Sequence, residues 1–352
     1  MAEISFGVWN MEWLNDLFTT VNGQVAFKPD DSKVRGPRSG NNVRQRRDSL
    51  AGVLNALAFD AVVVVEGPNT AEELQHFFDA PEVDGAWRCV VQRSPRMSQC
   101  VGIAVRTDTG KFANPPLVQF DALDAASGAI NKASDPFDFD SDDDGINERH
   151  KFERRPLYIE LRLAGGAQCR VVGLHLKSKG IFSAYEWSKW WALAGANRMK
   201  LLAQCRRFRQ LFLDAYLSDA ATRDVPLLVC GDINDGPGFD TSEMLLKASA
   251  VETLMGSVWQ PGLCLGNALF DALPVKDQEA LDFEDLATTR FSDPIFNDTF
   301  HKVWIDHILY TRNGHGTWVK DGKVHASVGN QAIWRAFPFA SDHYPISATV
   351  AP

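Results

Sequence analysis

Polar side chains that can bind a metal or transfer a proton follow many of the short apolar runs in this sequence. Asn10 and Glu12 come directly after the first run, and Glu66 ends the run that begins at Ala61. Further along the chain the same pattern recurs at His175, Asp232, Asn234, Asp306, Asp342 and His343. Carboxylate and amide oxygens suit hard cations, and histidine exchanges a proton near neutral pH. A packing role alone does not produce this pattern, so we predict that these groups converge on one site.

The apolar runs themselves indicate β-strands, whose ends are rigid mounts for functional side chains. Most are short and rich in β-branched residues, and the run from Leu157 to Leu163 alternates apolar and polar residues as a half-buried strand does. The predicted strands are Ile4–Val8, Ala61–Val65, Arg88–Val91, Val101–Val105, Leu157–Leu163, Cys169–Leu176, Leu227–Cys230, Ile305–Tyr310 and Ile346–Val350.

Fewer stretches show helical spacing of apolar residues. The clearest are Val43–Phe59 and Ala196–Leu217. Strands outnumber helices and do not alternate strictly with them, which favours two sheets faced by helices. No internal repeat or low-complexity linker divides the chain. We therefore expect a single domain over residues 1–352, with insertions at about 14–42, 114–154 and 260–299.

The composition is that of a globular protein with a buried core. Of the 352 residues 45% are apolar and 23% are charged. The longest aliphatic run, Ala61–Val65, is too short to cross a bilayer, and the N-terminus lacks a basic flank followed by an apolar stretch. We expect no membrane insertion and a cytoplasmic location. Six scattered cysteines without a CxxC pair argue against a zinc site and a disulfide framework. A net charge of −9 disfavours a protein that coats DNA by bulk attraction, but clustered metal-binding carboxylates would also make a chain acidic.

The second insertion is strongly acidic. Its residues Asp140, Asp142, Asp144 and Gly145 match the opening of a calcium loop, but Lys151 stands where such a loop needs a bidentate carboxylate. A solvated acidic loop is the favoured interpretation, and a weak Ca²⁺ site is the alternative.

The motifs, taken in order, resemble the endonuclease/exonuclease/phosphatase family, which includes DNase I-like nucleases. They are Asn10, Glu66, Arg155-Pro156, His175, Gly231-Asp232-x-Asn234, Asp306 and Ser341-Asp342-His343. The resemblance extends over nearly the whole chain. It implies a four-layer α/β/β/α sandwich of two mostly antiparallel sheets flanked by helices, with the site at one end of the paired sheets. It also implies a divalent-metal-dependent hydrolase that acts on phosphate esters.

The same resemblance implies roles for the site residues. Glu66, Asp342 and the amide oxygen of Asn10 would bind one or two Mg²⁺ or Mn²⁺ ions. His343 would transfer a proton, and Asp306 would hydrogen-bond its far nitrogen. The role of Glu12 stays open between support of the site and capping of the strand.

Further residues would act on the phosphate. If residues 232–234 are extended, Asp232 and Asn234 point the same way and could orient the attacking water, contact a second metal or bind the phosphate. Either Asp232 or His343 could be the base. His175 would donate a hydrogen bond to a non-bridging oxygen, and Arg155 and Lys177 would bind the phosphate. His307 should point away from the site because it follows Asp306 along an alternating strand.

The segment after His175 bears on the substrate. It interleaves Lys177, Lys179 and Lys189 with Tyr185, Trp187, Trp190 and Trp191. This pattern suits nucleic acid, although the tryptophans could instead pack the helix that follows. Arginines after the first strand, at positions 35, 38 and 44, could contact distant phosphates or form surface ion pairs.

We therefore expect an endo- or exonuclease that hydrolyses DNA or RNA by in-line attack of an activated water. The alternative is a phosphatase or phosphodiesterase that acts on a small-molecule or lipid head-group phosphate. A catalytically inactive binding scaffold is the least favoured interpretation, and no obligate protein partner is evident.

Overall fold

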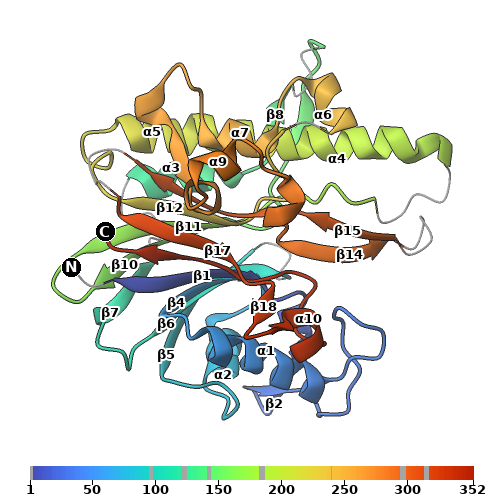
Figure 1. Cartoon of the computed structure of the whole chain (residues 1–352), viewed down its shortest axis with the longest axis vertical. Helices are drawn as coiled ribbons and strands as arrows, with labels where there is room; N and C mark the ends of the chain where they lie inside the picture. The colour runs from blue at the N-terminus through green and yellow to red at the C-terminus, as the bar shows by residue number, and fades with distance from the viewer. Residues whose placement is uncertain are drawn as a thin grey trace.

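Two six-stranded sheets pack face to face, and helices cover the outer face of each (Figure 1). The computed structural model describes residues 3–94, 98–119, 125–140, 144–181, 187–238, 240–293, 299–312 and 317–352. Of the ten neighbouring strand pairs in these two sheets eight are antiparallel, and only β1 with β4 and β11 with β12 run parallel. The predicted four-layer α/β/β/α sandwich of mostly antiparallel sheets is confirmed.

The first sheet gathers strands from both ends of the chain. Its order is β17 (Val319–Val324), β20 (Ile346–Val350), β1 (Ile4–Asn10), β4 (Ala61–Gly67), β6 (Cys100–Arg106) and β5 (Trp87–Gln92). Helices α1 (Val43–Leu57), α2 (Ala71–Phe78) and α10 (Ile333–Ala336) lie on its outer side. A capping box at Asn42 and Gln45 begins α1 and so places the helix directly after the first long connection.

The second sheet carries the middle of the chain. Its order is β13 (Leu265–Asn267), β16 (Asp306–Thr311), β12 (Leu227–Asp232), β11 (Gln168–His175), β10 (Leu157–Leu163) and β7 (Phe112–Gln119). Outside it lie α3 (Ala125–Ser134), α7 (Ala250–Met255) and the long α4 (Trp187–Phe208). A π-helical turn over Arg209–Leu213 connects α4 to α5 (Asp214–Ser218), so the predicted helix Ala196–Leu217 is continuous but not uniform.

Strand β4 shows how the layers pack. Val63 and Val65 belong to the core between the sheets, whereas Val62 and Val64 face the core beneath α1 and α2. A central strand that is buried on both faces needs apolar residues at every position, which accounts for its unbroken aliphatic run.

The predicted insertions contain short elements. The first holds η1 (Leu14–Leu17) and the hairpin β2 (Phe18–Val21) and β3 (Gln24–Phe27), and the second holds β8 (Phe137–Phe139) and β9 (Glu148–His150). The third holds η3 (Pro261–Leu263), β13, α8 (Ala268–Asp271), α9 (Val275–Gln278), η4 (Phe283–Leu286) and part of the hairpin β14 (Thr289–Asp293) and β15 (Thr299–Val303). The remaining small elements are α6 (Thr241–Leu246) and the pair β18 (Ser327–Val328) and β19 (Gln331–Ala332).

Two further predictions can be compared with the structure. All six cysteines are unpaired, and all but Cys264 are buried, as expected for reduced thiols. Among the described residues, no helix combines the length and the apolar character that a membrane span needs.

Candidate active site

Three neighbouring strands of the second sheet present polar side chains in one row. His175 ends β11 and is the register partner of Asp232 at the end of β12, which in turn is the partner of Asp306 at the start of β16. Residues opposite one another in a sheet share a face, so all three side chains lie together, and all three are buried. The glycine before Asp232 is required by the packing: at Gly231, φ is +132° and a Cβ atom would lie 2.0 Å from the carbonyl oxygen of Leu174.

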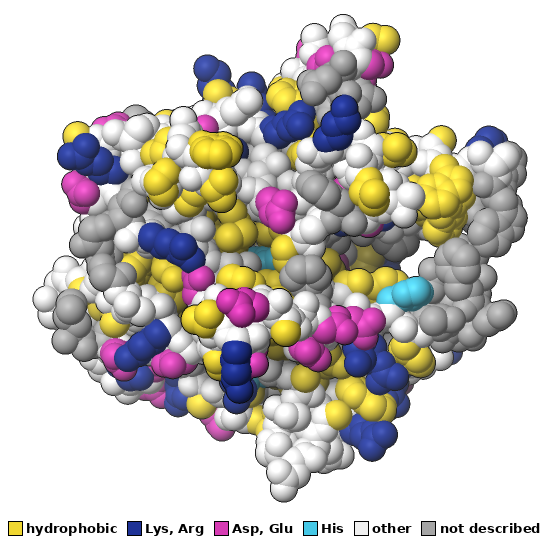
Figure 2. All heavy atoms as spheres, turned by 45° about the horizontal axis from the view of Figure 1, so that its top comes forward, with side chains coloured by type: hydrophobic (Ala, Val, Ile, Leu, Met, Phe, Trp, Pro, Cys, Tyr) yellow, Lys and Arg dark blue, Asp and Glu magenta, His cyan; other side chains and the backbone are white. Residues whose placement is uncertain are grey.

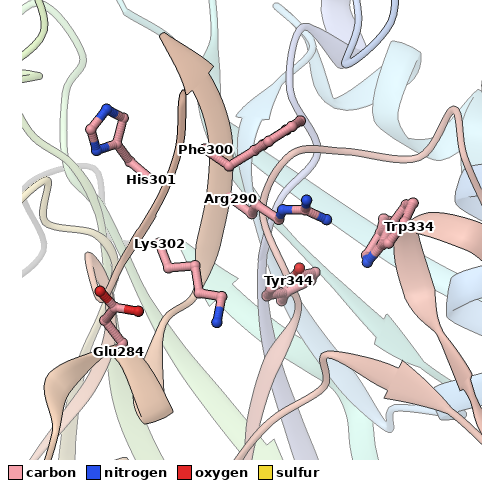
Figure 3. Close-up of a pocket in the computed structure, with 7 residues that line it drawn as sticks. All are labelled: Glu284, Arg290, Phe300, His301, Lys302, Trp334 and Tyr344. Carbon is pink, nitrogen blue, oxygen red and sulfur yellow. The ribbon is translucent and has the colours of Figure 1, made fainter. Parts of the chain in front are cut away.

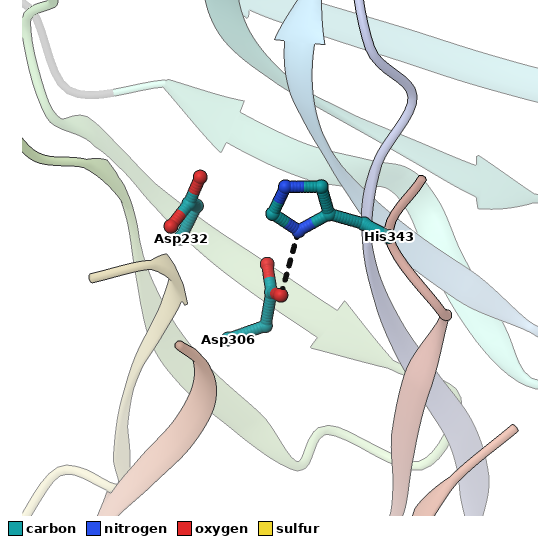
Figure 4. Close-up of side chains that lie close together, drawn as sticks. All are labelled: Asp232, Asp306 and His343. Atoms are coloured by element: carbon teal, nitrogen blue, oxygen red, sulfur yellow. Dashed lines mark hydrogen bonds and ion pairs between the residues drawn. The ribbon is translucent and has the colours of Figure 1, made fainter. Parts of the chain in front are cut away.

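His343 lies in the segment before β20, and it forms a histidine–carboxylate pair with Asp306 of this row (Figure 4). His343 Nδ1 lies 2.8 Å from Asp306 Oδ2, and the Thr288 hydroxyl donates to the same oxygen at 2.7 Å. Because an ionised carboxylate only accepts, Nδ1 carries the proton and Nε2 is left for the site. Burial lowers the pKa of His343, but the Asp306 carboxylate outweighs it and the net pKa lies well above its usual value. The expected pairing of these two residues is present.

Asn10 connects the two sheets at this point. Its Nδ2 donates to Asp232 Oδ2 at 3.1 Å and lies 3.5 Å from His343 Nε2, while its Oδ1 accepts the backbone N–H of Glu12 at 2.9 Å. Burial, with Asp306 nearby, raises the pKa of Asp232 to about 7. Asp232, Asp306 and His343 have ligand atoms within 4.8 Å of one another. Since Asp306 and His343 bond each other, this group suits proton transfer better than ion binding.

A second acidic group lies beside the first and joins Glu12, Glu66 and Asp342. Glu66 Oε2 accepts the backbone N–H of Trp13 at 3.0 Å, and Glu12 Oε2 accepts that of Asp342 at 3.2 Å. Burial and the neighbouring carboxylates of Asp342 and Glu66 raise the pKa of Glu12 to about 8, and Arg46 opposes this shift. Asp342 Oδ1 is buried without a hydrogen-bond partner among the described residues. Converging carboxylates with an unsatisfied oxygen fit a divalent cation.

Glu12, whose role the sequence left open, thus lies in the candidate metal site. The signal that could have found it is the Asn-x-Glu spacing itself, but the spacing does not reveal the backbone turn that brings the side chain inward. Left-handed conformations gather around the site at non-glycine positions, namely Glu12 (φ 44°), Trp13 (φ 56°), Glu66 (φ 52°), Gln99 (φ 51°) and Asn234 (φ 59°). Such strained positions cluster where a fold holds functional groups.

Arg46 is a fully buried arginine that ties the two loops of the metal site together. From α1 it donates to the carbonyls of Met11 (2.7 Å) and Glu12 on one side, and to those of Phe339 (2.8 Å) and Ala340 on the other. These two segments carry Glu12 and Asp342. In the sequence nothing distinguishes Arg46 from its neighbours Arg44 and Arg47, and only the fold reveals that it is buried.

His175 faces both acidic groups. Its Nε2 lies 3.8 Å from Asp232 Oδ2 and 4.0 Å from Glu66 Oε1. Burial and the nearby Arg154 hold the pKa of His175 well below its usual value, so the ring is neutral and can donate a hydrogen bond without carrying charge.

The arginine that reaches the site is Arg154 rather than the predicted Arg155. The Arg154 guanidinium donates to Gln99 Oε1, and the Gln99 amide donates in turn to Glu66. Arg155 is exposed, and its backbone N–H bonds the hydroxyl of Ser94 at 2.9 Å. An arginine doublet ahead of a strand does not show which member faces inward.

Two predicted residues differ in detail from expectation. Strand β12 ends at Asp232, and Asn234 is left-handed, so the assumed extended alternation is wrong. Asp232 Oδ1 instead accepts the Asn234 backbone N–H at 3.0 Å, and Asn234 Nδ2 donates to the Leu176 carbonyl at 3.2 Å. Lys177 is half-buried and its Nζ donates to the Ser178 carbonyl at 2.8 Å; burial lowers its pKa.

The lysine- and tryptophan-rich segment after His175 offers fewer side chains for substrate binding than its composition indicates. Lys179 forms ion pairs with the buried carboxylates of Asp235 and Glu243. Tyr185 lies outside the described residues, and Trp191 on α4 is 64% exposed.

Two other expectations concern residues away from the site. His307 faces the opposite side of β16, as expected, and its Nε2 donates to the Asp235 carbonyl at 2.7 Å. In the acidic insertion, Asp140 accepts the backbone N–H groups of Asp144 and Gly145, and Asp142 lies outside the described residues. The calcium site stays a prediction.

Comparisons with known proteins identify a family and structures with a similar fold. A model of the Endonuclease/Exonuclease/phosphatase family matches residues 7–343. The chain is similar to truncated Caenorhabditis elegans TDP2, with a TM-score of 0.51 and 13% identity over 99% of this chain and 98% of that chain. It is also similar to an endonuclease/exonuclease/phosphatase from Beutenbergia cavernae DSM 12333, with a TM-score of 0.51 and 13% identity over 100% of this chain and 72% of that chain. A search of curated proteins found no match. At this identity the solved structures support the fold alone.

Proposed function

Because the chain belongs to the endonuclease/exonuclease/phosphatase family, whose members hydrolyse phosphate esters, we propose that it is a metal-dependent nuclease that cleaves phosphodiester bonds of DNA or RNA. The observation that carries this proposal is the convergence of two groups on one site. One is the His343–Asp306 pair with Asp232, and the other is the carboxylate cluster of Glu12 and Glu66 with Asp342.

The carboxylate cluster is the part that would hold the metal. Glu66 and Asp342 are the expected ligands, Glu12 joins them, and Asn10 adjoins them from β1. A bound Mg²⁺ or Mn²⁺ would supply positive charge against the phosphoryl oxygens. The cluster contains only oxygen ligands, which favours these hard cations over zinc.

The histidine–carboxylate pair is the part that would move protons. Asp306 holds the Nδ1 proton of His343, so that Nε2 faces Asn10 and the neighbouring Asp232. Asp232 is itself fixed by bonds from Asn10 and from the Asn234 backbone. A water held between Asp232 and His343 can give its proton to Asp232, and the protonated Nε2 of His343 can then donate its proton to the leaving oxygen.

Hydrogen-bond donors elsewhere in the site would stabilise the negative charge that develops on the phosphate in the transition state. Neutral His175 lies within reach of both acidic groups and can donate to a non-bridging oxygen. Arg154 adds positive charge on the same side, because it acts together with burial to lower the pKa of both His175 and Lys177. Exposed Arg155 could contact phosphate further from the scissile bond.

One observation favours the second candidate, a phosphatase or phosphodiesterase for small substrates. Of the arginines expected to contact distant phosphates, Arg44 pairs with Asp48 and Glu82, and its neighbour Arg47 pairs with Glu82 and Asp30. Acidic and basic side chains are also interspersed on the face shown in Figure 2, without one continuous basic surface. Arg35 and Arg38, the other two, instead lie over the rings of Trp13 and Phe339.

An EDTA-controlled activity panel separates the two candidates. Purified protein is incubated with plasmid, single-stranded DNA, RNA, inositol phosphates and simple phosphomonoesters, each with Mg²⁺ or with EDTA. The nuclease proposal predicts Mg²⁺-dependent cleavage of at least one polynucleotide at a kcat/KM well above that for the monoesters. Hydrolysis of monoesters or inositol phosphates alone would favour the second candidate.

A further inference from the structure

A cavity of about 330 Å³ opens beside the proton-transfer histidine (Figure 3). Its walls come from the hairpin β14–β15, from α10, from η4 and from the residue that follows His343. The lining residues are Glu284, Arg290, Phe300, His301, Lys302, Trp334 and Tyr344. Its volume lies at the lower end of the range for ligand-binding pockets, roughly 300–1,000 Å³.

The cavity is joined directly to the catalytic segment. The backbone N–H of Arg290 donates to the Asp342 carbonyl at 3.0 Å, and that of Tyr344 donates to the Thr288 carbonyl at 2.6 Å. Thr288 also bonds Asp306. A ligand that fills the cavity therefore lies beside the residues that would act on the scissile phosphate.

Two cations face the cavity without compensation. Arg290 and Lys302 are direct register partners on β14 and β15, so both side chains leave the same face of the hairpin. Like charges in this arrangement repel. Within the described part of the chain neither forms an ion pair, and although Glu284 lines the cavity it makes none either. In a protein with a net charge of −9, two opposed cations on the wall of one cavity indicate an anionic ligand.

Aromatic rings surround the same arginine. The Arg290 guanidinium carbon lies 4.1 Å from the Phe300 ring centroid and 4.9 Å from that of Trp334. Stacked guanidinium groups keep their in-plane N–H donors free for a phosphate. Phe300 is 58% exposed, which leaves ring surface for a further planar group. His301 points to the opposite side of β15 in Figure 3.

We propose that this cavity binds a nucleotide next to the scissile phosphate of single-stranded DNA or RNA. Arg290 and Lys302 contact its phosphate, and the exposed ring of Phe300 stacks on its base. Stacking on protein rings requires a base that is free of a duplex, which selects single strands over double strands. The inference rests on the proposed nuclease function and names its substrate class.

The test measures binding and turnover separately. Fluorescence anisotropy of a labelled single-stranded oligonucleotide is recorded in EDTA at several salt concentrations, and hydrolysis of bis(p-nitrophenyl) phosphate is recorded with Mg²⁺. The variants are Arg290→Ala/Lys302→Ala and Trp334→Ala. The matched control is Arg312→Ala/Lys320→Ala, which removes two cations that already pair with Asp271 and Glu3.

The double variant should bind the oligonucleotide at least about 10-fold more weakly, and the log–log salt slope should fall by about 0.7 for each lost phosphate contact. Trp334→Ala should weaken binding about 5-fold or more, because Arg290 loses one of the rings on which its guanidinium is stacked. Hydrolysis of the minimal diester should stay within about two-fold, because it does not reach the cavity. The control should bind as the wild type does. Far-UV circular dichroism confirms that each variant is folded. Arg290→Lys keeps the charge but not the planar group that stacks, so its affinity for the oligonucleotide should lie between those of the wild type and the double variant.

Unchanged oligonucleotide binding in the double variant would overturn the inference while the nuclease proposal stands. So would a variant that loses affinity for inositol hexakisphosphate but not for the oligonucleotide, since the cavity would then bind small anions. Failure of the wild type to hydrolyse any diester would instead remove the proposed function, and the anisotropy measurement would still report on the cavity.

Discussion

Replacing Arg46 tests whether the two loops of the metal site are held in place by one buried side chain. Its guanidinium donates to four carbonyls, two on the Met11–Glu12 segment and two on the Phe339–Ala340 segment. Hydrogen bonds to a charged group contribute roughly 1.5–3 kcal/mol each, and part of that is recovered when water enters. Breaking such a buried charged network costs about 3–5 kcal/mol.

Arg46→Met should therefore lower the free energy of unfolding by about 3–5 kcal/mol, a large part of the roughly 5–15 kcal/mol typical of a domain. Arg46→Lys keeps the charge but cannot span both segments with a fork of donors, so a loss of about 2 kcal/mol is expected. In the folded fraction, a shift of about 1 Å in either loop would reduce turnover by about 10². The Mg²⁺ concentration for half-maximal activity should rise, because Glu12 and Asp342 are no longer held together.

Urea unfolding and Mg²⁺ activation curves measure both effects. The matched control is Arg47, the next residue of α1, which pairs with the exposed carboxylate of Asp30 and the mostly buried one of Glu82. Arg47→Lys should change stability by less than about 1 kcal/mol and leave Mg²⁺ activation unaltered. If Arg46→Lys has the stability and the Mg²⁺ activation of the wild type, Arg46 does not hold the two loops of the metal site together.

Three further outcomes follow from the site and its surroundings. His343→Ala and Asp306→Ala should each reduce kcat by at least ~10², and the double variant should lose little more, because the carboxylate acts through the imidazole; losses that multiply in a double-mutant cycle would contradict the pairing. A pKa of about 8 at Glu12 means that metal must displace a proton, so Mg²⁺ affinity should rise with pH up to about 8 and calorimetry at pH 7 should detect proton release that Glu12→Gln abolishes; equal release in both proteins would exclude Glu12. Burial lowers the pKa of His325 to about 4, so the unfolded chain takes up the proton first and stability should fall as pH drops from 6.5 to about 4; His325→Gln should flatten this part of the pH–stability curve, and an unchanged slope would contradict the shift.

Much of the sheet framework could be predicted from the sequence because its central strands are buried on one or both faces. Each of the nine predicted runs is a strand, and the polar residues at their ends do meet. Three of the four strands at the sheet edges, β7, β13 and β17, were missed. The strand β7 contains Asn114-Pro115-Pro116, and β17 contains Asp321-Gly322, so neither has the apolar pattern that burial imposes.

The site was predictable in its residue types but not in its local backbone. The roles of Glu12 and Asn234 depend on left-handed turns that extended-strand reasoning does not anticipate. Arg46 and Arg154 act through contacts to segments more than thirty residues away, and their neighbours Arg47 and Arg155 are the same residue type in the same local context. Only the tertiary structure decides which member of each pair faces the site.

The central claim, a metal-dependent phosphodiesterase site, is tested most directly by one titration. After treatment with EDTA and its removal, initial rates of phosphodiester hydrolysis on single-stranded oligonucleotides are measured against Mg²⁺ concentration for the wild type and for Glu66→Gln. The wild type should have no activity without metal and should saturate with Mg²⁺, and Glu66→Gln should require at least about 10-fold more Mg²⁺ or stay inactive. Undiminished hydrolysis in EDTA, or an Mg²⁺ curve that Glu66→Gln does not move, would contradict the account.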